Sequence, residues 1–230
     1  MNRSTFLLLF FITGCATSPS NGGEELGPAL SKEETESPSS AMSNPAAIAD
    51  SGSRVVSGDS ERLLATPPRN WKLSYRLNNE KSRLSDFVPP AESDTNWTTK
   101  VSFESFRGLV DTDPITILLQ EALRDEDKCS FVQHFNLFSG DENAYPTSVR
   151  LFMCGNNSFI DKGEVKLIKA IAGNEYFYMI KIIKRLASFE PNQPDVAKQE
   201  IAMWSAYVRD ISVCDPNQAE HPCPPSPTTD

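Results

Sequence analysis

The sequence predicts an α+β fold, mainly an antiparallel sheet with two packing helices, behind a disordered N-terminal tether. Several segments after residue 70 alternate apolar and polar residues, as half-buried strands do. Two other segments carry apolar residues at spacings of three and four, as amphipathic helices do. Residues 16–70 contain no aromatic residue and are rich in Ser, Pro, Gly, Glu and Ala, which is typical of disorder.

The first residues have the pattern of an export signal. Arg3 is the only charge before an apolar run at residues 6–12, and this run is too short for a bilayer core that needs roughly 20 residues. Residues 12–15, Ile-Thr-Gly-Cys, resemble the lipobox of bacterial lipoproteins. The resemblance is confined to residues 1–15. It implies that residues 1–14 are a signal peptide and that Cys15 carries fatty acyl chains such as palmitate. The alternative is an ordinary signal peptide with an accidental cysteine.

The lipobox resemblance also implies a place in the cell envelope. Residue 16 is Ala rather than Asp, which by analogy with the enterobacterial sorting rule favours the outer membrane over the inner one. The formal net charge of −9 argues against nucleic acid as a partner and against electrostatic binding to anionic lipid. The lipid bilayer is therefore expected as a partner only through Cys15. A tether over residues 15–70 would have a mean span of about 40 Å, enough to hold a domain clear of the membrane surface.

The predicted domain covers residues 71–215, and residues 216–230 form a Pro-rich tail. Strands are expected at residues 71–77, 97–106, 131–138, 147–154, 164–172 and 175–185, with a polar loop at 139–146 and a tight turn at Gly173 and Asn174. One helix should begin at an Asp113 cap followed by Pro114. Another should begin near Pro194, with its apolar stripe at Ala197, Ile201, Trp204, Val208 and Ile211. This element order resembles the Mog1/PsbP-like fold, in topology alone.

The last predicted hairpin has one clearly apolar face and one mixed face. If Ala172 faces Glu175, then Val165, Leu167 and Ile171 share the core face with Tyr176, Tyr178, Ile180 and Ile182. The other face carries apolar residues with a basic rim, which often marks a binding site for a protein partner. The possible partner surface consists of Ile168, Phe177, Met179 and Ile183. The favoured interpretation, with two helices available, is that a helix covers this face, in which case these residues belong to the core.

Four cysteines remain after Cys15, and an even count in an exported protein suggests two disulfides. The register of the strands at 131–138 and 147–154 favours a bond between Cys129 and Cys154, which leaves a local bond between Cys214 and Cys223. A metal site is the less favoured alternative, because the spacings of closed zinc sites are missing. We expect no metal and no cofactor.

The sequence carries no catalytic motif. His134 lies in a predicted strand and His221 in the Pro-rich tail, where no rigid geometry is expected. The acidic pair Asp111 and Asp113 is explained by helix capping, and the pair Asp141 and Glu142 by a soluble loop. The favoured hypothesis is therefore a non-enzymatic envelope lipoprotein that binds an envelope protein or supports an assembly. The alternatives are a hydrolase with a carboxylate-based site and a carrier of small apolar ligands.

Overall fold

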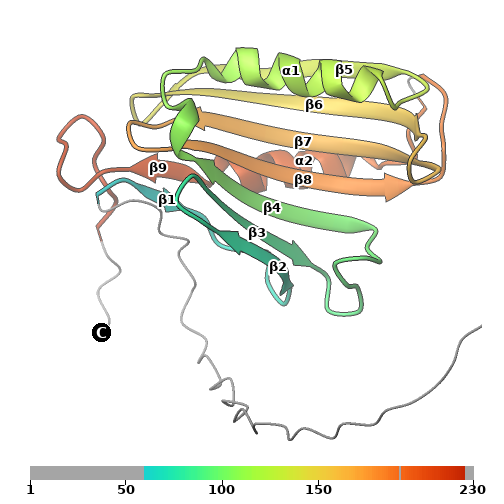
Figure 1. Cartoon of the computed structure of the whole chain (residues 1–230), viewed down its shortest axis with the longest axis horizontal. Helices are drawn as coiled ribbons and strands as arrows, with labels where there is room; N and C mark the ends of the chain where they lie inside the picture. The colour runs from blue at the N-terminus through green and yellow to red at the C-terminus, as the bar shows by residue number, and fades with distance from the viewer. Residues whose placement is uncertain (1–59, 192, 226–230) are drawn as a thin grey trace, which may run out of the picture. The chain divides into compact units, whose positions relative to one another are not determined.

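The structure, a computed structural model, describes residues 60–191 and 193–225. A seven-stranded antiparallel sheet has the strand order β2-β3-β4-β8-β7-β6-β5, and a small second sheet pairs β1 with β9 (Figure 1). The strands are β1 (Arg62–Leu64), β2 (Lys72–Asn78), β3 (Ser82–Val88), β4 (Thr99–Phe106), β5 (Val132–Glu142), β6 (Tyr145–Asn157), β7 (Lys162–Ala172), β8 (Phe177–Leu186) and β9 (Ser212–Cys214). The predicted fold class is confirmed, whereas Cys15 and the predicted tether up to residue 59 lie outside the described residues.

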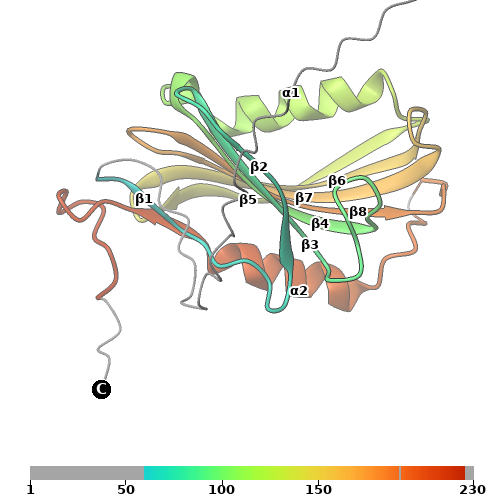
Figure 2. The same cartoon turned by 60° about the horizontal axis from the view of Figure 1, so that its bottom comes forward.

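The two helices, α1 (Pro114–Glu126) and α2 (Lys198–Arg209), lie on opposite faces of the large sheet (Figure 2). The predicted start of α1 is confirmed, because the Asp113 carboxylate accepts from the backbone N–H groups of Ile115 and Thr116, each at 3.2 Å. The second helix begins a few residues after the predicted start. Within the described part of the chain, neither helix has the length and apolar composition needed to span a membrane.

The core divides between the two faces. Under α2, Trp204 and Val208 pack on a large cluster that includes Leu167 and Ile180. Under α1, Leu118 packs on a smaller cluster from β6, β7 and β8. Both faces of the β7–β8 hairpin are therefore buried, as a central position in a two-sided sheet requires.

The hairpin registers differ from those predicted. Ala172 pairs with Phe177 rather than with Glu175. Because side chains alternate with a period of two, this shift of two residues leaves every side chain on its predicted face. In the other hairpin the strands continue through the predicted polar loop, and β5 and β6 are joined by Asn143 and Ala144 alone. Both residues have positive φ, at 51° and 60°, as a two-residue hairpin turn of type I′ requires.

The domain begins earlier than predicted, because the segment before residue 71 is anchored at one end of the large sheet. Glu61 is fully buried. Its carboxylate accepts from the backbone N–H groups of Asn174 at 2.6 Å and Tyr176 at 3.3 Å, and from the Tyr178 hydroxyl at 2.9 Å. Gly173 permits this approach, since a Cβ built there would lie 2.3 Å from Glu61 Oε1. The contact attaches the segment before β1 to the β7–β8 turn.

We predict that Gly173→Ala lowers the free energy of unfolding by about 1–3 kcal/mol, as overpacking usually does, because the added methyl group would lie 2.3 Å from the Glu61 carboxylate and 2.6 Å from the Tyr176 carbonyl oxygen. Gly108→Ala is the matched control, since a Cβ there meets nothing within 4 Å. Urea unfolding of both variants and the wild type measures the difference. Equal stability of the three proteins would contradict the role assigned to Glu61.

A buried lysine joins the end of α2 to the sheet. Lys169 is fully buried in β7, and its ammonium group donates to the carbonyl oxygens of Val208 at 3.0 Å and Ile211 at 2.6 Å. It also pairs with Glu142 at the end of β5. The last carbonyl groups of a helix have no partner within the helix, and a cation there is favourable. Burial lowers the pKa of Lys169, an effect that Glu142 opposes.

The structure joins the same two cysteine pairs that the sequence predicts, with S–S distances of 2.13 Å for Cys129 and Cys154 and 2.02 Å for Cys214 and Cys223. Cys129 precedes β5 and forms an isolated bridge with Asn157, so the first bond links the chain after α1 to β6. In the chain-entropy model each such bond contributes about 3 kcal/mol.

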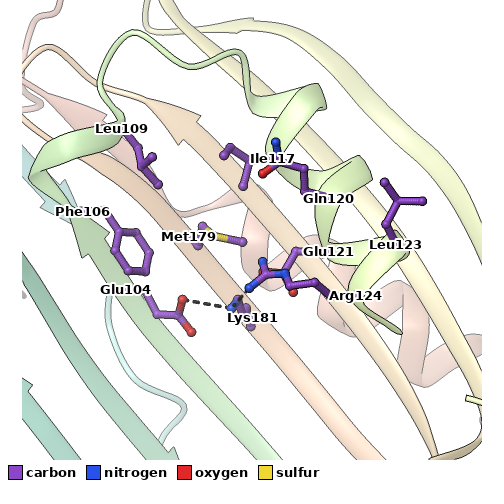
Figure 3. Close-up of a pocket in the computed structure, with 10 residues that line it drawn as sticks. All are labelled: Glu104, Phe106, Leu109, Ile117, Gln120, Glu121, Leu123, Arg124, Met179 and Lys181. Carbon is purple, nitrogen blue, oxygen red and sulfur yellow. Dashed lines mark hydrogen bonds and ion pairs between the residues drawn. The ribbon is translucent and has the colours of Figure 1, made fainter. Parts of the chain in front are cut away.

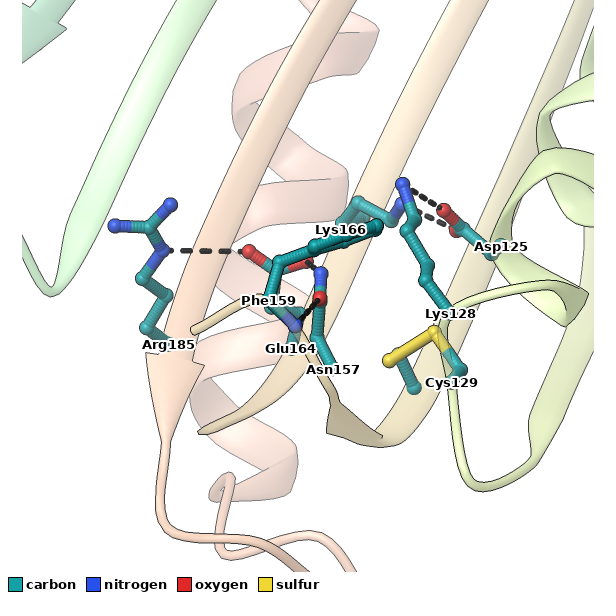
Figure 4. Close-up of a disulfide and its surroundings, with 9 residues drawn as sticks. Asp125, Lys128, Cys129, Asn157, Phe159, Glu164, Lys166 and Arg185 are labelled. Carbon is teal, nitrogen blue, oxygen red and sulfur yellow. Dashed lines mark hydrogen bonds and ion pairs between the residues drawn. A yellow bond between two sulfur atoms is a disulfide. The ribbon is translucent and has the colours of Figure 1, made fainter. Parts of the chain in front are cut away.

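Ion pairs surround the Cys129–Cys154 bond (Figure 4). Asp125, buried at the end of α1, pairs with Lys166 and, at 2.9 Å, with Lys128. Glu164 pairs with Arg185 at 3.3 Å. The buried carboxylates at this end of the sheet therefore have cationic partners, as burial of a charge requires.

The predicted tail has a fixed structure up to residue 225. His221 is buried, its ring is stacked on that of Tyr145 with centroids 3.9 Å apart, and its Nδ1 lies 2.8 Å from the Asn143 carbonyl oxygen. The expectation that His221 has no fixed geometry is therefore wrong. The reason is the Cys214–Cys223 bond, which holds the loop against the β5–β6 turn.

We predict a pH-dependent stability that Tyr145 controls in part. Burial, and next the negative charge of Glu61, raise the pKa of Tyr145 above 10.0. The folded protein therefore keeps this proton at a pH where the unfolded chain has lost it, and stability falls as pH rises through 10. Tyr145→Phe should make that fall shallower by up to about 1.4 kcal/mol per pH unit.

Urea unfolding between pH 8 and 11 measures this difference. Lys169, whose lowered pKa acts with the opposite sign, is present in both proteins, so comparison of the variant with the wild type isolates Tyr145. Identical slopes for the two proteins would contradict the assignment.

Candidate functional site

The face of the sheet that carries α1 is only partly covered. The helix lies over β5, β6 and β7, and the sheet continues past it through β4, β3 and β2 without a second helix (Figures 1 and 2). An α-helix is about 10 Å wide with its side chains, and strands lie about 4.8 Å apart. One helix can therefore cover two or three of the seven strands.

The predicted partner surface lies on this face, and most of it is closed. Ile168 and Phe177 have no exposed surface, Met179 is 3% exposed, and all three belong to the cluster under α1. Ile183 is half-buried. The favoured interpretation, in which a helix covers this face, is therefore confirmed: α1 covers the hairpin there, and the possible partner surface is not open at these positions.

A groove lies directly beside the covered part, between α1 and strands β4 and β8 (Figure 3). Its volume is about 600 Å³ and it opens to solvent. We call it the α1 groove and define it by the residues that line it: Glu104, Phe106, Leu109, Ile117, Gln120, Glu121, Leu123, Arg124, Met179 and Lys181. Met179, from the predicted partner surface, contributes to it.

The helical wall of the α1 groove follows from the period of α1. Ile117, Gln120, Glu121 and Arg124 have the spacing i, i+3, i+4 and i+7, which places them on one side of a helix. Leu123 lies at the margin of this side and is 60% exposed. Figure 3 shows Leu109 and Phe106 at the end of the groove near β4. The rim is thus largely apolar.

A chain of ion pairs links the floor of the α1 groove, on β4 and β8, to its helical wall. Lys181 Nζ lies 2.9 Å from Glu104 Oε2 and 3.8 Å from Glu121 Oε1, and Arg124 pairs with the same oxygen of Glu121. The two negative charges of Glu104 and Glu121 equal the two positive charges of Lys181 and Arg124. A groove of balanced charge with an apolar rim has no electrostatic preference for an anion or a cation, and it suits a surface that is itself mostly apolar.

The polar floor continues onto β3. Asp86 Oδ1 accepts from the Ser102 hydroxyl at 2.6 Å and Asp86 Oδ2 pairs with Lys100 at 2.8 Å. The Ser102 hydroxyl also lies 3.3 Å from Glu104 Oε1. Asp86 and Ser102 are buried, so polar contacts between neighbouring strands close this part of the face. Tyr75 and Leu77 on β2, at the edge, are 46% and 39% exposed.

The chemistry of the α1 groove favours binding over catalysis. None of the residues that line it is a Ser, Thr, Cys, His or Tyr, the usual nucleophiles and bases apart from carboxylates and lysine. Its two carboxylates both pair with Lys181, so neither is placed as an isolated general acid. Among the described residues, no three His, Cys, Asp or Glu side chains gather as metal ligands would.

A second groove lies on the other side of the sheet, between α2 and strands β4 and β8. It has a volume of about 550 Å³, and Trp71, Trp204, Val101 and Ile182 are among its lining residues. It opens to solvent, whereas small-molecule sites typically enclose most of the ligand surface. The geometry of this groove therefore supports the carrier hypothesis less well than the α1 groove supports binding of a protein.

The remaining predicted residues do not converge on either groove. Asp113 caps α1, Glu142 pairs with Lys169, and His134 lies on the edge strand with its Nδ1 3.2 Å from Arg150. The α1 groove escaped the sequence analysis because its residues come from segments far apart in the chain. The one local signal was the side of α1 at positions 117, 120, 121 and 124.

Comparisons with known proteins give distant likenesses in structure alone. No family model and no curated protein matches the sequence. The Ran-binding protein Mog1p of Saccharomyces cerevisiae is 14% identical over 67% of this chain and 92% of its own, with a TM-score of 0.38. A variant of protein Mog1 is 13% identical over 63% of this chain and 78% of its own, with a TM-score of 0.35. Mog1 structures are thus neighbours at low identity, and a likeness this distant says nothing about what the chain binds.

Proposed function

We propose that this chain is a lipid-anchored module of a bacterial cell envelope, attached to the outer membrane through Cys15, and that it binds another protein in the α1 groove. The activity is binding rather than catalysis. The observation that carries the proposal is the half-covered face of the sheet, where an apolar rim surrounds a floor of balanced charge.

The anchor rests on the first fifteen residues. Arg3, the short apolar run at 6–12 and the sequence Ile-Thr-Gly-Cys at 12–15 together resemble a lipobox signal. Two or more acyl chains on one residue hold a protein stably at a membrane, whereas one chain holds it reversibly. The two cysteine pairs of the domain suit an oxidising compartment outside the cytoplasm.

We predict that Cys15→Ser moves the full-length chain from the membrane fraction to the soluble fraction and abolishes incorporation of radiolabelled palmitate. A tenfold or greater loss from membranes is expected, because removal of two acyl chains costs far more than the 1.4 kcal/mol that gives a factor of about ten. Cys223→Ser is the control and should keep both the palmitate label and the association with membranes. Membrane association of Cys15→Ser at the wild-type level would contradict the anchor.

The shape of the α1 groove fits a helix. The groove runs along α1, and packed helices lie 8–10 Å apart (typical values). A partner helix beside α1 would lie over β4 and β3 and complete the helical layer on this face. The wall residues of α1 already have the spacing of a helix–helix contact, so the groove presents ridges that a second helix can meet.

The charges also define the partner. Glu104, Glu121, Lys181 and Arg124 are mutually paired, so a partner need not supply compensating charge. It must instead cover Leu123, Leu109 and Phe106 at the rim. An amphipathic helix with an apolar stripe does this, and recognition of a helix in an apolar groove is a common mode of peptide binding.

We predict that a photo-crosslinking amino acid at Leu77 or Leu123 captures one protein in intact cells, whereas the same amino acid at Phe159 does not. Phe159 is the matched control, because it is 83% exposed and lies on the β6–β7 turn, away from the groove. Adding Leu123→Glu to the protein with the probe at Leu77 should reduce capture about tenfold, since a buried leucine contributes about 1.5–3 kcal/mol.

The identity of the captured species decides between the hypotheses. Crosslinks that map to an apolar stripe on a helix of another protein support the proposal. Capture of lipid would instead indicate the carrier, and capture that is equal at Phe159 would contradict a specific site. Leu123→Glu should keep the wild-type unfolding midpoint, because the Leu123 side chain is mostly exposed.

A further inference from the structure

β5 is an outer strand of the large sheet, and among the described residues no strand pairs with its second edge. Residues 134–141 are eight consecutive exposed positions, and only His134 and Asp141 among them are ionisable. Phe135, Leu137 and Phe138 are 44%, 47% and 38% exposed. Proteins usually guard a free edge with charged residues, prolines or a short strand, because its unpaired backbone groups can bind another strand.

The opposite edge of the sheet is guarded. β2 has seven residues, two of which, Lys72 and Arg76, are basic, and a bulge interrupts it between Leu73 and Tyr75. β5 has eleven residues and no lysine, arginine or proline. The contrast singles out β5 as the edge that can accept another strand.

β5 has its own bulge, and this bulge sets which side chains share a face. The register shifts between Asn136 and Phe138, so that Leu137 is the extra residue. Phe135 is paired with Leu151 and Phe138 with Val149, and both partners belong to the core cluster under α2. The two phenylalanines therefore lie on the same face of the sheet, although their numbers differ by three.

We propose that a second copy of this chain pairs with the β5 edge, antiparallel and across a twofold axis near Leu137. Residues that face each other in an antiparallel pair must lie on the same face. If Phe135 lies opposite Phe138 of the second copy, the residues that face each other lie on the same face of the sheet both before and after the bulge. This register is also symmetric about the twofold axis: Phe135 of each copy faces Phe138 of the other, as a closed contact between identical surfaces requires.

The charges of β5 agree with this register. Asp141 lies opposite Val132 of the second copy, and His134 lies opposite Ser139. No two like charges meet, although the whole chain has a formal net charge of −9. Two Phe135–Phe138 pairs flank the axis, and aromatic cross-strand pairs are among the favourable ones in antiparallel sheets.

The apolar surface extends from the edge toward α2. Leu137 and Phe138 line a groove with Ala202 and Ala206 of α2. In the dimer, this groove would lie beside the two paired β5 strands, and the two large sheets would form one continuous sheet. The inference is independent of the α1 groove, which is on the other face.

The test is cysteine crosslinking of the full-length chain in intact cells. In this register Leu137 faces Asn136 of the second copy, so the two Leu137 Cα atoms are offset by one residue, about 3.4 Å, along strands about 4.8 Å apart. Leu137→Cys therefore places two thiols on either side of the axis with Cα atoms about 6 Å apart, within the range of a disulfide. Copper phenanthroline should then produce a covalent dimer that is absent under reducing conditions, with the crosslink mapped to residue 137 in both chains. Leu77→Cys on β2 is the control of similar exposure and should give at least tenfold less dimer.

A second variant tests the register. Adding Phe138→Asp to Leu137→Cys should reduce the dimer at least fivefold, because it removes both aromatic pairs without disturbing the core. The inference is overturned if Leu137→Cys gives no more dimer than Leu77→Cys, or if its thiol crosslinks to a different protein. It is also overturned if Phe138→Asp leaves the dimer unchanged.

Discussion

The structure depends on the difference in width between a helix and a sheet. Seven strands at about 4.8 Å spacing make a sheet of about 29 Å, and a helix is about 10 Å wide. Each face of the sheet has one helix, so each face needs something else to cover the rest. On the α2 face, Trp71 and the pair β1–β9 pack beside the helix and extend the core to Phe87 on β3. On the α1 face, no second helix of the described chain takes that place, and ion pairs between neighbouring strands and the buried Trp97, which lies against Lys100 and Arg185, occupy it.

Buried polar groups fix the parts that the apolar core does not reach. Glu61 attaches the first described residues to the β7–β8 turn, and Lys169 attaches the end of α2 to β7 and β5. Each of these side chains satisfies backbone groups that would otherwise be buried without partners. They set the ends of the sheet and the position of α2, and the large core under α2 depends on both. On the α1 face, the buried Asp86 of β3 accepts from Ser102 and pairs with Lys100 of β4, whereas Tyr75 and Leu77 on the edge strand β2 remain exposed.

The sequence predicted those features that depend on local chemistry. Asp113 followed by Pro114 marks a helix start wherever it lies, and the faces of β7 and β8 survived a register shift of two residues because strand side chains alternate. Periodicity missed β1 and β9, which have three residues each and are too short to show alternation. It also missed β3 (Ser82–Val88), whose apolar residues Leu84, Phe87 and Val88 do not alternate with polar ones. It assigned the end of β5 to a loop, because an edge strand exposed on both faces has the composition of a loop. The α1 groove was not predictable, because Glu104, Leu123 and Lys181 meet only through the packing of α1 on the sheet.

The central claim is that the open half of the α1 face is covered by a partner in the cell. Hydroxyl-radical footprinting of Tyr75 and Leu77, on native membranes and on the purified chain, tests it most directly, with Phe159 as the internal reference. We expect several-fold lower labelling of Tyr75 and Leu77 in membranes and unchanged labelling of Phe159. Equal labelling of all three residues in both preparations would contradict it.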